Sequence, residues 1–370
     1  MTFPSLVLRN LLRQRVRTLL TVLGISVGIT TVVALGAVTE GMRQTSGAII
    51  RTGNADFMVA QNGASDFSFS TVQQSELDRI AARPDVARAV GVLYNITGVG
   101  GNAFFPEMGV RPDQLPAIVG RSTAGRLLSG APDEAVLGEG AARSLHASVG
   151  ESILLGRTRV RVVGTFRSSS RFENGGAYLP LRTVQRIAGK PDTVTAVYVT
   201  VAPGADPKRV AASIERDEPT LATISSVSEY GKVDQGMTML DALQLAISLL
   251  AVGIGAIGVT NTMVMSVLER TREIGILRAV GWSRRRIMTS VLGEGVALCV
   301  LAGIVGMALG VAAAQAIMLV PTISSFLTPV YAPAIFVRAF AIAVLVGLAG
   351  AAYPAFRATR LTPMEALRHE

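Results

Sequence analysis

The sequence predicts a membrane protein in which four transmembrane α-helices carry one large α+β extracytoplasmic domain, inserted between the first and second helices. Of the 370 residues, 49% are hydrophobic and only 16% are charged, whereas soluble domains carry about 25% charged residues. The mean hydropathy is +0.45. Long charge-free runs occur near the N-terminus and in the last third of the chain, and the charged residues between them are balanced in sign.

The charge-free runs set the predicted boundaries. The first, residues 18–39, is bounded by Arg17 and Glu40 and gives about 33 Å of helix, enough to cross a hydrocarbon core of about 30 Å. A signal peptide is the alternative, but its apolar core is usually shorter. Four transmembrane helices are predicted, at 18–39, 242–268, 287–320 and 339–356, and Pro354 lies near the end of the last one. The segments between and around them are an amphipathic cytoplasmic segment at 1–17, the outer domain at 40–241, a cytoplasmic loop at 269–286, an outer loop at 321–338 and a cytoplasmic tail at 357–370.

The basic residues predict the orientation. Residues 40–241 contain 21 basic and 21 acidic side chains, so the net charge of +9 lies entirely in the membrane part and its flanks. Arginines concentrate before the first run, in 269–286 and after the last run. This positive-inside distribution places both termini in the cytoplasm and the 40–241 domain outside, in a bacterial cytoplasmic membrane. It does not fit a nucleic-acid surface, so no nucleic-acid partner is expected.

The 40–241 segment has the alternating pattern of strands interspersed with helix-like stretches, which predicts an α+β domain. Strands are expected at 56–60, 159–166 and 195–201, and helices at 73–82 and 206–216. Glycine and proline clusters predict loops at 98–116 and 130–132.

Several short motifs have a structural explanation. The run Gly24–Gly28 matches the hydrolase motif GxSxG, but inside a transmembrane helix the required strand–turn–helix cannot form. Gly24 and Gly28, and likewise Gly306 and Gly310, are spaced to let two helices approach closely. One cysteine, two histidines and the lack of GxxxxGK[ST] argue against a metal, redox or ATP site in this chain.

Two polar residues within the apolar runs are candidates for an intramembrane role. A carboxylate such as Glu294 is costly at membrane depth, which makes it a functional candidate unless it stays hydrated near the cytoplasmic surface, the interpretation that we favour. Asn261, with Thr260 and Thr262 beside it, is expected to form hydrogen bonds between helices rather than a transport site.

The loop at 269–286 is the most informative stretch. It has helical spacing, with Ile274, Leu277 and Val280 on one side and charged residues around them. A short amphipathic helix between two spans can dock a cytoplasmic partner. It can also lie on anionic lipid through its arginines. Composition alone leaves both interpretations open.

The same residues carry a family resemblance. Residues 269–281 resemble the E-R-x-R-E-I-G-[IL]-[LM]-[KR]-A-[LIV]-G signature of MacB/FtsX-type ABC transporter permeases. Residues 15–42 are similar to the family's first span, and 135–166 with 177–180 to a MacB-like outer domain. The C-terminal run 361–368 is similar to the family's [IV]-[DTN]-P-x-E-A-L-R ending. The four motifs occur in the family's order along the whole chain.

The resemblance implies a non-catalytic permease subunit that exports or extracts a peptide-like, antibiotic or lipoprotein-like substrate by mechanotransmission. It implies two copies of a separate cytoplasmic ATPase, which would hold ATP and Mg while this chain binds no cofactor. Further implied partners are a second permease copy in a homo- or heterodimer, the lipid bilayer, and an extracytoplasmic adaptor or enzyme. The residues that match the ATPase-coupling helix are Glu269, Arg270, Arg272, Glu273, Ile274, Gly275, Leu277, Arg278, Ala279 and Gly281.

Two alternatives stay open at this point. One is an FtsX-like signalling platform that activates a cell-wall hydrolase outside the cell. The other is a membrane-anchored enzyme, which the 40–241 domain does not favour because it has one histidine, no cysteine and no recognisable catalytic spacing. The second charge-free run is longer than the bilayer requires, so its helix could continue into the outer domain near Gln235. Such a helix could act as a lever in signalling or in transport.

Overall fold

The structure, a computed structural model, describes residues 15–50, 52–100, 102–119, 122–168, 170–320 and 327–360. They form two compact units. The membrane unit contains the described residues up to Glu40, Ala242–Ile317, and those from Pro329 onward; the outer unit contains Gly41–Asp241 and Met318–Thr328. The amphipathic segment predicted at 1–17 lies almost wholly outside the described residues, as does most of the tail at 357–370.

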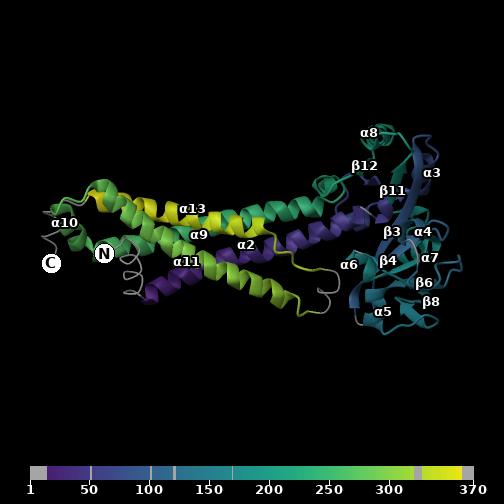
Figure 1. The fold of residues 1–370 in the computed structure, drawn as a ribbon, viewed down its shortest axis with the longest axis horizontal. Coiled ribbons are helices and arrows are strands. Elements are labelled where there is room, and N and C mark those ends of the chain that lie inside the picture. The colour runs from purple at the N-terminus through teal and green to yellow at the C-terminus, as the bar shows by residue number, and fades with distance from the viewer. Residues whose placement is uncertain are drawn as a thin grey trace. The chain divides into compact units, whose positions relative to one another are not determined.

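Within the described residues, four helices are long and apolar enough to cross a membrane. They are longer than the charge-free runs, because helical structure continues past the bilayer into charged sequence. Helix α2 ends beyond the predicted 39, and α9 begins before 242, at Gln235, from which we expect a lever. Figure 1 shows both as long continuous helices. The helices of this unit are α2 (Arg15–Ile50), α9 (Gln235–Glu269), the short α10 (Thr271–Ala279), α11 (Arg284–Ile317) and α13 (Pro333–Arg360).

Small residues allow these helices to pack closely. A Cβ on Gly295 would lie 2.5 Å from the Cβ of Ala351, so α11 and α13 approach through their backbones. Helix α13 extends further than the predicted 339–356, on both sides. Pro354 does not end it: the residue is buried inside the helix, which continues to Arg360. A proline within a membrane helix is tolerated where neighbouring helices satisfy the freed backbone groups.

The outer unit is built on one mixed sheet of ten strands among the described residues, in the order β12-β1-β11-β3-β4-β9-β6-β8-β5, with β7 paired to β8. The pairs β4–β9 and β6–β8 are parallel and the other pairs are antiparallel. A separate small pair joins β10 to β2. The strands are β1 (Phe57–Gln61), β2 (Val72–Gln73), β3 (Val86–Val99), β4 (Asn102–Val110), β5 (Ala124–Gly125), β6 (Glu134–Gly138), β7 (Ser152–Leu155), β8 (Thr158–Phe166), β9 (Ala177–Pro180), β10 (Thr193–Val194), β11 (Ala196–Val201) and β12 (Leu221–Ile224).

Both faces of this sheet are covered. Strand β1 alternates: Phe57 and Val59 enter one core, Met58 and Ala60 the other. Helices α3, α5, α7 and α8 pack on the first core. The end of α2, α4, and the short helices η2 and η3 pack on the second. The helices are α3 (Gln74–Ala81), α4 (Leu115–Val119), α5 (Glu139–Leu145), α6 (Arg171–Asn174), α7 (Leu181–Ala188) and α8 (Pro207–Asp217), with η1 (Thr52–Asn54), η2 (Phe67–Phe69) and η3 (Val227–Lys232).

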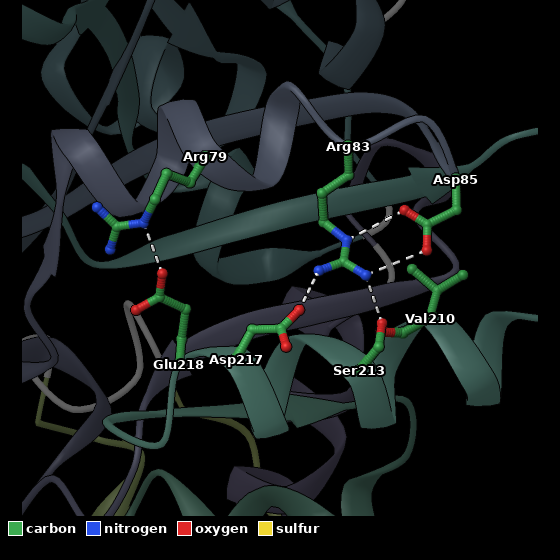
Figure 2. Close-up of polar contacts among 7 residues, drawn as sticks. All are labelled: Arg79, Arg83, Asp85, Val210, Ser213, Asp217 and Glu218. Carbon is green, nitrogen blue, oxygen red and sulfur yellow. Dashed lines mark hydrogen bonds and ion pairs between the residues drawn. The ribbon is translucent and has the colours of Figure 1, made fainter.

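A polar network joins α3 to α8. Figure 2 shows Arg83, just after α3, reaching across to α8, where it donates to Asp217 at 2.6 Å and to Ser213 at 2.6 Å, while Asp85 accepts from it at 3.1 Å. This arginine lowers the pKa of the Asp85 carboxyl. A second pair, Arg79 with Glu218, lies beside it. The two helices are therefore held together on one face of the sheet.

The predicted α+β elements of the outer domain are confirmed in position. The strands expected at 56–60, 159–166 and 195–201 are β1, β8 and β11, and the helices expected at 73–82 and 206–216 are α3 and α8. The loop predicted at 98–116 is wrong in part. It contains β4, because that strand pairs with β3 and β9 despite its glycine and proline content.

Candidate functional site

Helix α10 is attached to α9 by one non-helical residue. Helix α9 ends at Glu269, and Arg270 has φ −108° and ψ 15°, so the chain turns before α10 begins. The hydroxyl of Thr271 donates back to the carbonyl oxygens of Val267 at 3.1 Å and Leu268 at 2.8 Å. These are carbonyls that the end of a helix leaves without an intrahelical partner. These hydrogen bonds therefore fix the orientation of α10 relative to α9.

The two sides of α10 differ. Ile274 is buried in the core of the membrane unit, Gly275 is buried beside it, and Leu277 is half-buried. The opposite side is exposed, with Ile276 at 47% and Val280 at 78% exposure. The predicted placement of Val280 with Ile274 and Leu277 is therefore wrong. The remaining exposed side chains on this side are those of Arg272, Glu273 and Ala279.

The turn after α10 explains why Val280 leaves the packed side. Gly281 has φ +99°, a conformation that favours glycine. The amide of Gly281 donates to the carbonyl of Arg278, and that of Trp282 to the carbonyl of Leu277. The indole of Trp282 then lies against Arg286 in the first turn of α11, with the guanidinium 5.0 Å from the ring centre. The helix thus ends at Ala279, and Val280 belongs to the turn.

An ion pair anchors the first turn of α10 to α11. Arg270 lies 3.0 Å from a carboxylate oxygen of Glu294 and 3.1 Å from one of Glu273. Glu294 is only 8% exposed, so the expectation that it stays hydrated is wrong. Its cost of burial is offset by the arginine, because a buried charge is tolerated when it is paired and hydrogen-bonded. Glu294 therefore pairs with the turn before α10 and is not an isolated intramembrane carboxylate.

A second anchor joins the end of α10 to α13. The guanidinium of Arg278 donates to the backbone carbonyl of Thr359 at 2.9 Å. This carbonyl lies in the last turn of α13, where cations interact favourably with the helix dipole. Helix α10 is thus tied to α9, α11 and α13 while its exposed side stays available. Sequence spacing gave no signal for the Thr359 contact, whereas the isolated charge of Glu294 did mark that residue.

Of the four glycines predicted to allow close helix packing, three lie at contacts between helices and one does not. A Cβ on Gly306 would lie 2.8 Å from the Cβ of Ile29, and one on Gly310 would lie 2.7 Å from the Cβ of Val33, so both glycines hold α11 against α2. Gly28 faces Ala251 on α9 in the same way. Gly24 does not take part in this packing. It is exposed, and a Cβ there would meet no described atom within 4 Å.

The polar residues of α9 also differ in role. The hydroxyl of Thr260 donates to the carbonyl of Gly350 on α13 at 2.8 Å, and the hydroxyls of Thr262 and Thr21 lie 2.7 Å apart between α9 and α2. Asn261 lies between them in sequence but is exposed, and it has no hydrogen bond to a described side chain or backbone. The hydroxyl of Ser26, the central residue of GxSxG, is buried and donates to the carbonyl of Val22 at 2.7 Å.

Two family descriptions match the chain. Residues 18–217 match the MacB-like periplasmic core domain, and residues 245–363 match the FtsX-like permease C-terminal region. The first of these matches alone covers more than half of the chain. Their order agrees with the order of the outer and membrane units.

Three relatives of known name are similar over nearly the whole chain. A macrolide export ATP-binding/permease protein MacB of Agrobacterium fabrum is 30% identical over 96% of this chain and 59% of its own length. The MacB protein of Bdellovibrio bacteriovorus is 28% identical over 98% of this chain and 61% of its own. The pyoverdine export ATP-binding/permease protein PvdT of Pseudomonas putida is 28% identical over 96% and 58%.

This chain spans about three fifths of the length of these relatives. The two domain matches, the four membrane-competent helices and the mixed outer sheet agree with one another. The chain therefore belongs to the MacB/FtsX-type family of ABC transporter permeases, multi-pass proteins of the inner membrane that join a MacB-like periplasmic core domain to an FtsX-like permease region.

Proposed function

We propose that this chain is the non-catalytic membrane subunit of an ABC exporter of the mechanotransmission type, and that α10 receives movement from a separate cytoplasmic ATPase. The observation that carries the proposal is the geometry of α10. Its inner side is anchored to three helices, while Ile276 and Val280 expose apolar surface on the other. Exposed apolar side chains next to charged ones are typical of a docking surface. ATP and Mg belong to the partner, and both termini lie in the cytoplasm.

Helix α9 supplies a means of transmission. Its 35 residues give about 52 Å of continuous helix, well beyond the roughly 30 Å of hydrocarbon. It begins in the outer unit at Gln235 and ends at the turn that holds α10. A displacement of α10 by the ATPase would thus be transmitted to the outer unit through α9, which is one continuous helix. The exported molecule is a peptide-like or antibiotic-like amphiphile, a proposal that the export names of the relatives support.

A second copy of a permease packs, in this proposal, against the exposed side of α9. Only 17% of the apolar window of α9 is buried, compared with 33–39% in the other three spans. Gly253 and Gly258 lie open, with no described atom within 4 Å of a Cβ, and small residues allow helices to approach closely. The exposed amide of Asn261 also requires a polar partner, since lipid offers none.

The test is affinity purification from native membranes in mild detergent, with mass spectrometry of the proteins that accompany the chain. We expect a Walker-motif ATPase in near-equal amount, and an at least tenfold loss of it with Ile276→Asp or Glu273→Arg. The control is Leu154→Asp, which places the same charge on an exposed apolar residue of the outer unit. Ile274→Asp is not suitable, because it places a charge in the packed core.

Two results would contradict the proposal. One is retention of the ATPase by both α10 variants. The other is the absence of an ATPase together with recovery of a cell-wall hydrolase, which would favour the FtsX-like signalling platform.

A further inference from the structure

The outer unit contains a cleft of about 660 Å³. It is bounded by the last turns of α2, by η1 and α4, and by the segments before α6 and η3; all of its lining residues belong to the outer unit. Its volume lies within the range of about 300–1,000 Å³ that is typical of small-molecule sites. Apolar side chains line part of it: Ile50, Ile118, Val119 and Val227.

The carboxylate of Glu173 also lines this cleft. Glu173 is 6% exposed. The hydroxyl of Thr52 donates to one carboxylate oxygen at 2.6 Å, and that of Ser168 donates to the other at 2.6 Å. Among the described residues, no lysine or arginine forms an ion pair with it. Arg167, the arginine among the described lining residues, is paired with Glu139 at 3.0 Å.

The described residues around Glu173 supply no positive charge that pairs with it. The buried side chains of Tyr94, Tyr178 and Tyr198 lie close to its carboxylate, and the hydroxyls of Tyr94 and Tyr198 lie 2.7 Å apart. Burial raises the pKa of Tyr94 and Tyr178 well above that of a free tyrosine, so both stay neutral at physiological pH. A buried carboxylate that lacks a cation is strongly disfavoured. Because no described residue compensates this charge, a cationic ligand would stabilise it.

We propose that this cleft binds a protonated amine carried on an apolar body, such as the free N-terminus of an apolar peptide. Each carboxylate oxygen of Glu173 has one donor and keeps a lone pair for an ammonium hydrogen. The apolar body packs against Ile50, Ile118 and Val227. The inference rests on the proposed function only in taking this ligand as the exported molecule; binding itself needs no ATPase.

The experiment compares two soluble peptides on the full chain in lipid nanodiscs, with empty nanodiscs as the background. One is Leu-Trp-Leu-amide, with a free ammonium group, and the other is its N-acetylated form, which is neutral. We expect wild type to bind the amine at least tenfold more tightly than the acetylated peptide. Glu173→Gln loses that preference, whereas the control Glu151→Gln, an exposed carboxylate outside the cleft, keeps it.

A second variant tests the cleft independently, in case Glu173→Gln does not fold. Val227→Trp fills the cleft from a position that is 38% exposed, and it should weaken binding of the amine while thermal unfolding stays unchanged. Equal binding of both peptides, or equal binding by wild type and Glu173→Gln, would overturn the role of the carboxylate. No binding of either peptide to wild type would overturn the site. The α10 variant Ile276→Asp should bind the amine as tightly as wild type does. A failure of the proposed ATPase coupling is thereby distinguished from a failure of the cleft to bind the peptide.

Discussion

The ion pair between Arg270 and Glu294 connects the turn before α10 to α11, and its two members are unequally exposed. The side chain of Glu294 is 11% exposed and that of Arg270 is 27%. Replacing Arg270 by glutamine leaves a carboxylate that is nearly buried and has lost its cation. Replacing Glu294 by glutamine leaves an arginine that reaches water and keeps Glu273 at 3.1 Å. We therefore expect the two substitutions to differ in effect.

The magnitudes follow from this asymmetry. Removing one partner of a buried pair costs about 3–5 kcal/mol when the other charge stays buried, so Arg270→Gln should lower the free energy of unfolding by about 3 kcal/mol. Glu294→Gln keeps the shape of the side chain and loses one charged hydrogen bond, so about 1 kcal/mol is expected. The double variant should lose about 1–2 kcal/mol, well below the sum of the single losses, because no unpaired carboxylate remains.

The assay is unfolding by SDS in mixed micelles, followed by tryptophan fluorescence. The chain has one tryptophan, Trp282, and it lies in the turn between α10 and α11, so the signal reports on the surroundings of this ion pair. Equal destabilisation by Arg270→Gln and Glu294→Gln would refute the argument from burial. An additive double variant would show that the two side chains do not interact.

Two further predictions concern the packing of α2 and the acid stability of the outer unit. Gly306→Leu should lower the free energy of unfolding by about 1–3 kcal/mol or prevent folding, because its side chain would collide with Ile29, whereas Gly24→Leu should leave the unfolding midpoint of the single chain unchanged. The hydrogen bond from Arg126 and those from Ser129 lower the pKa of Glu134 from 4.5 to about 2. Glu134 therefore adds about 3 kcal/mol above pH 4.5, and this is lost as the pH falls through about 2. Thermal unfolding between pH 7 and pH 2.5 should show a smaller decline for Glu134→Gln, and an equal decline would contradict the assignment.

The membrane helices could be predicted in number and approximate place, because a charge-free run must be helical in lipid. Their ends could not. Residues 40–50 and 235–241 contain charged side chains that end an apolar run without ending a helix, and Arg43 pairs with Asp241 at 2.6 Å across α2 and α9. Hydropathy reports where lipid ends, whereas backbone hydrogen bonding decides where the helix ends.

The helix α10 was predictable from its spacing, but its anchors were not. The contacts of Arg270 with Glu294 and of Arg278 with Thr359 join residues 24 and 81 positions apart, which no local pattern reveals. Helical spacing places Val280 on the same side as Ile274 and Leu277, but the helix ends at Ala279, before the turn in which Gly281 takes a left-handed conformation. The Glu173 cleft is likewise formed by segments far apart in sequence and gave no signal.

The two proposed sites share an element, which makes them thermodynamically linked. Helix α2 packs on α11 through Gly306 and Gly310, and its last turn, with Ile50, lines the Glu173 cleft. Movement that reaches α11 from α10 through the Arg270 ion pair therefore reaches a wall of the cleft, provided that α2 has two discrete arrangements. Coupling of this kind is reciprocal in binding free energy. A ligand in the cleft that favours one arrangement of α2 must then change the affinity of α10 for the proposed ATPase by the same factor by which that ATPase changes the affinity for the ligand.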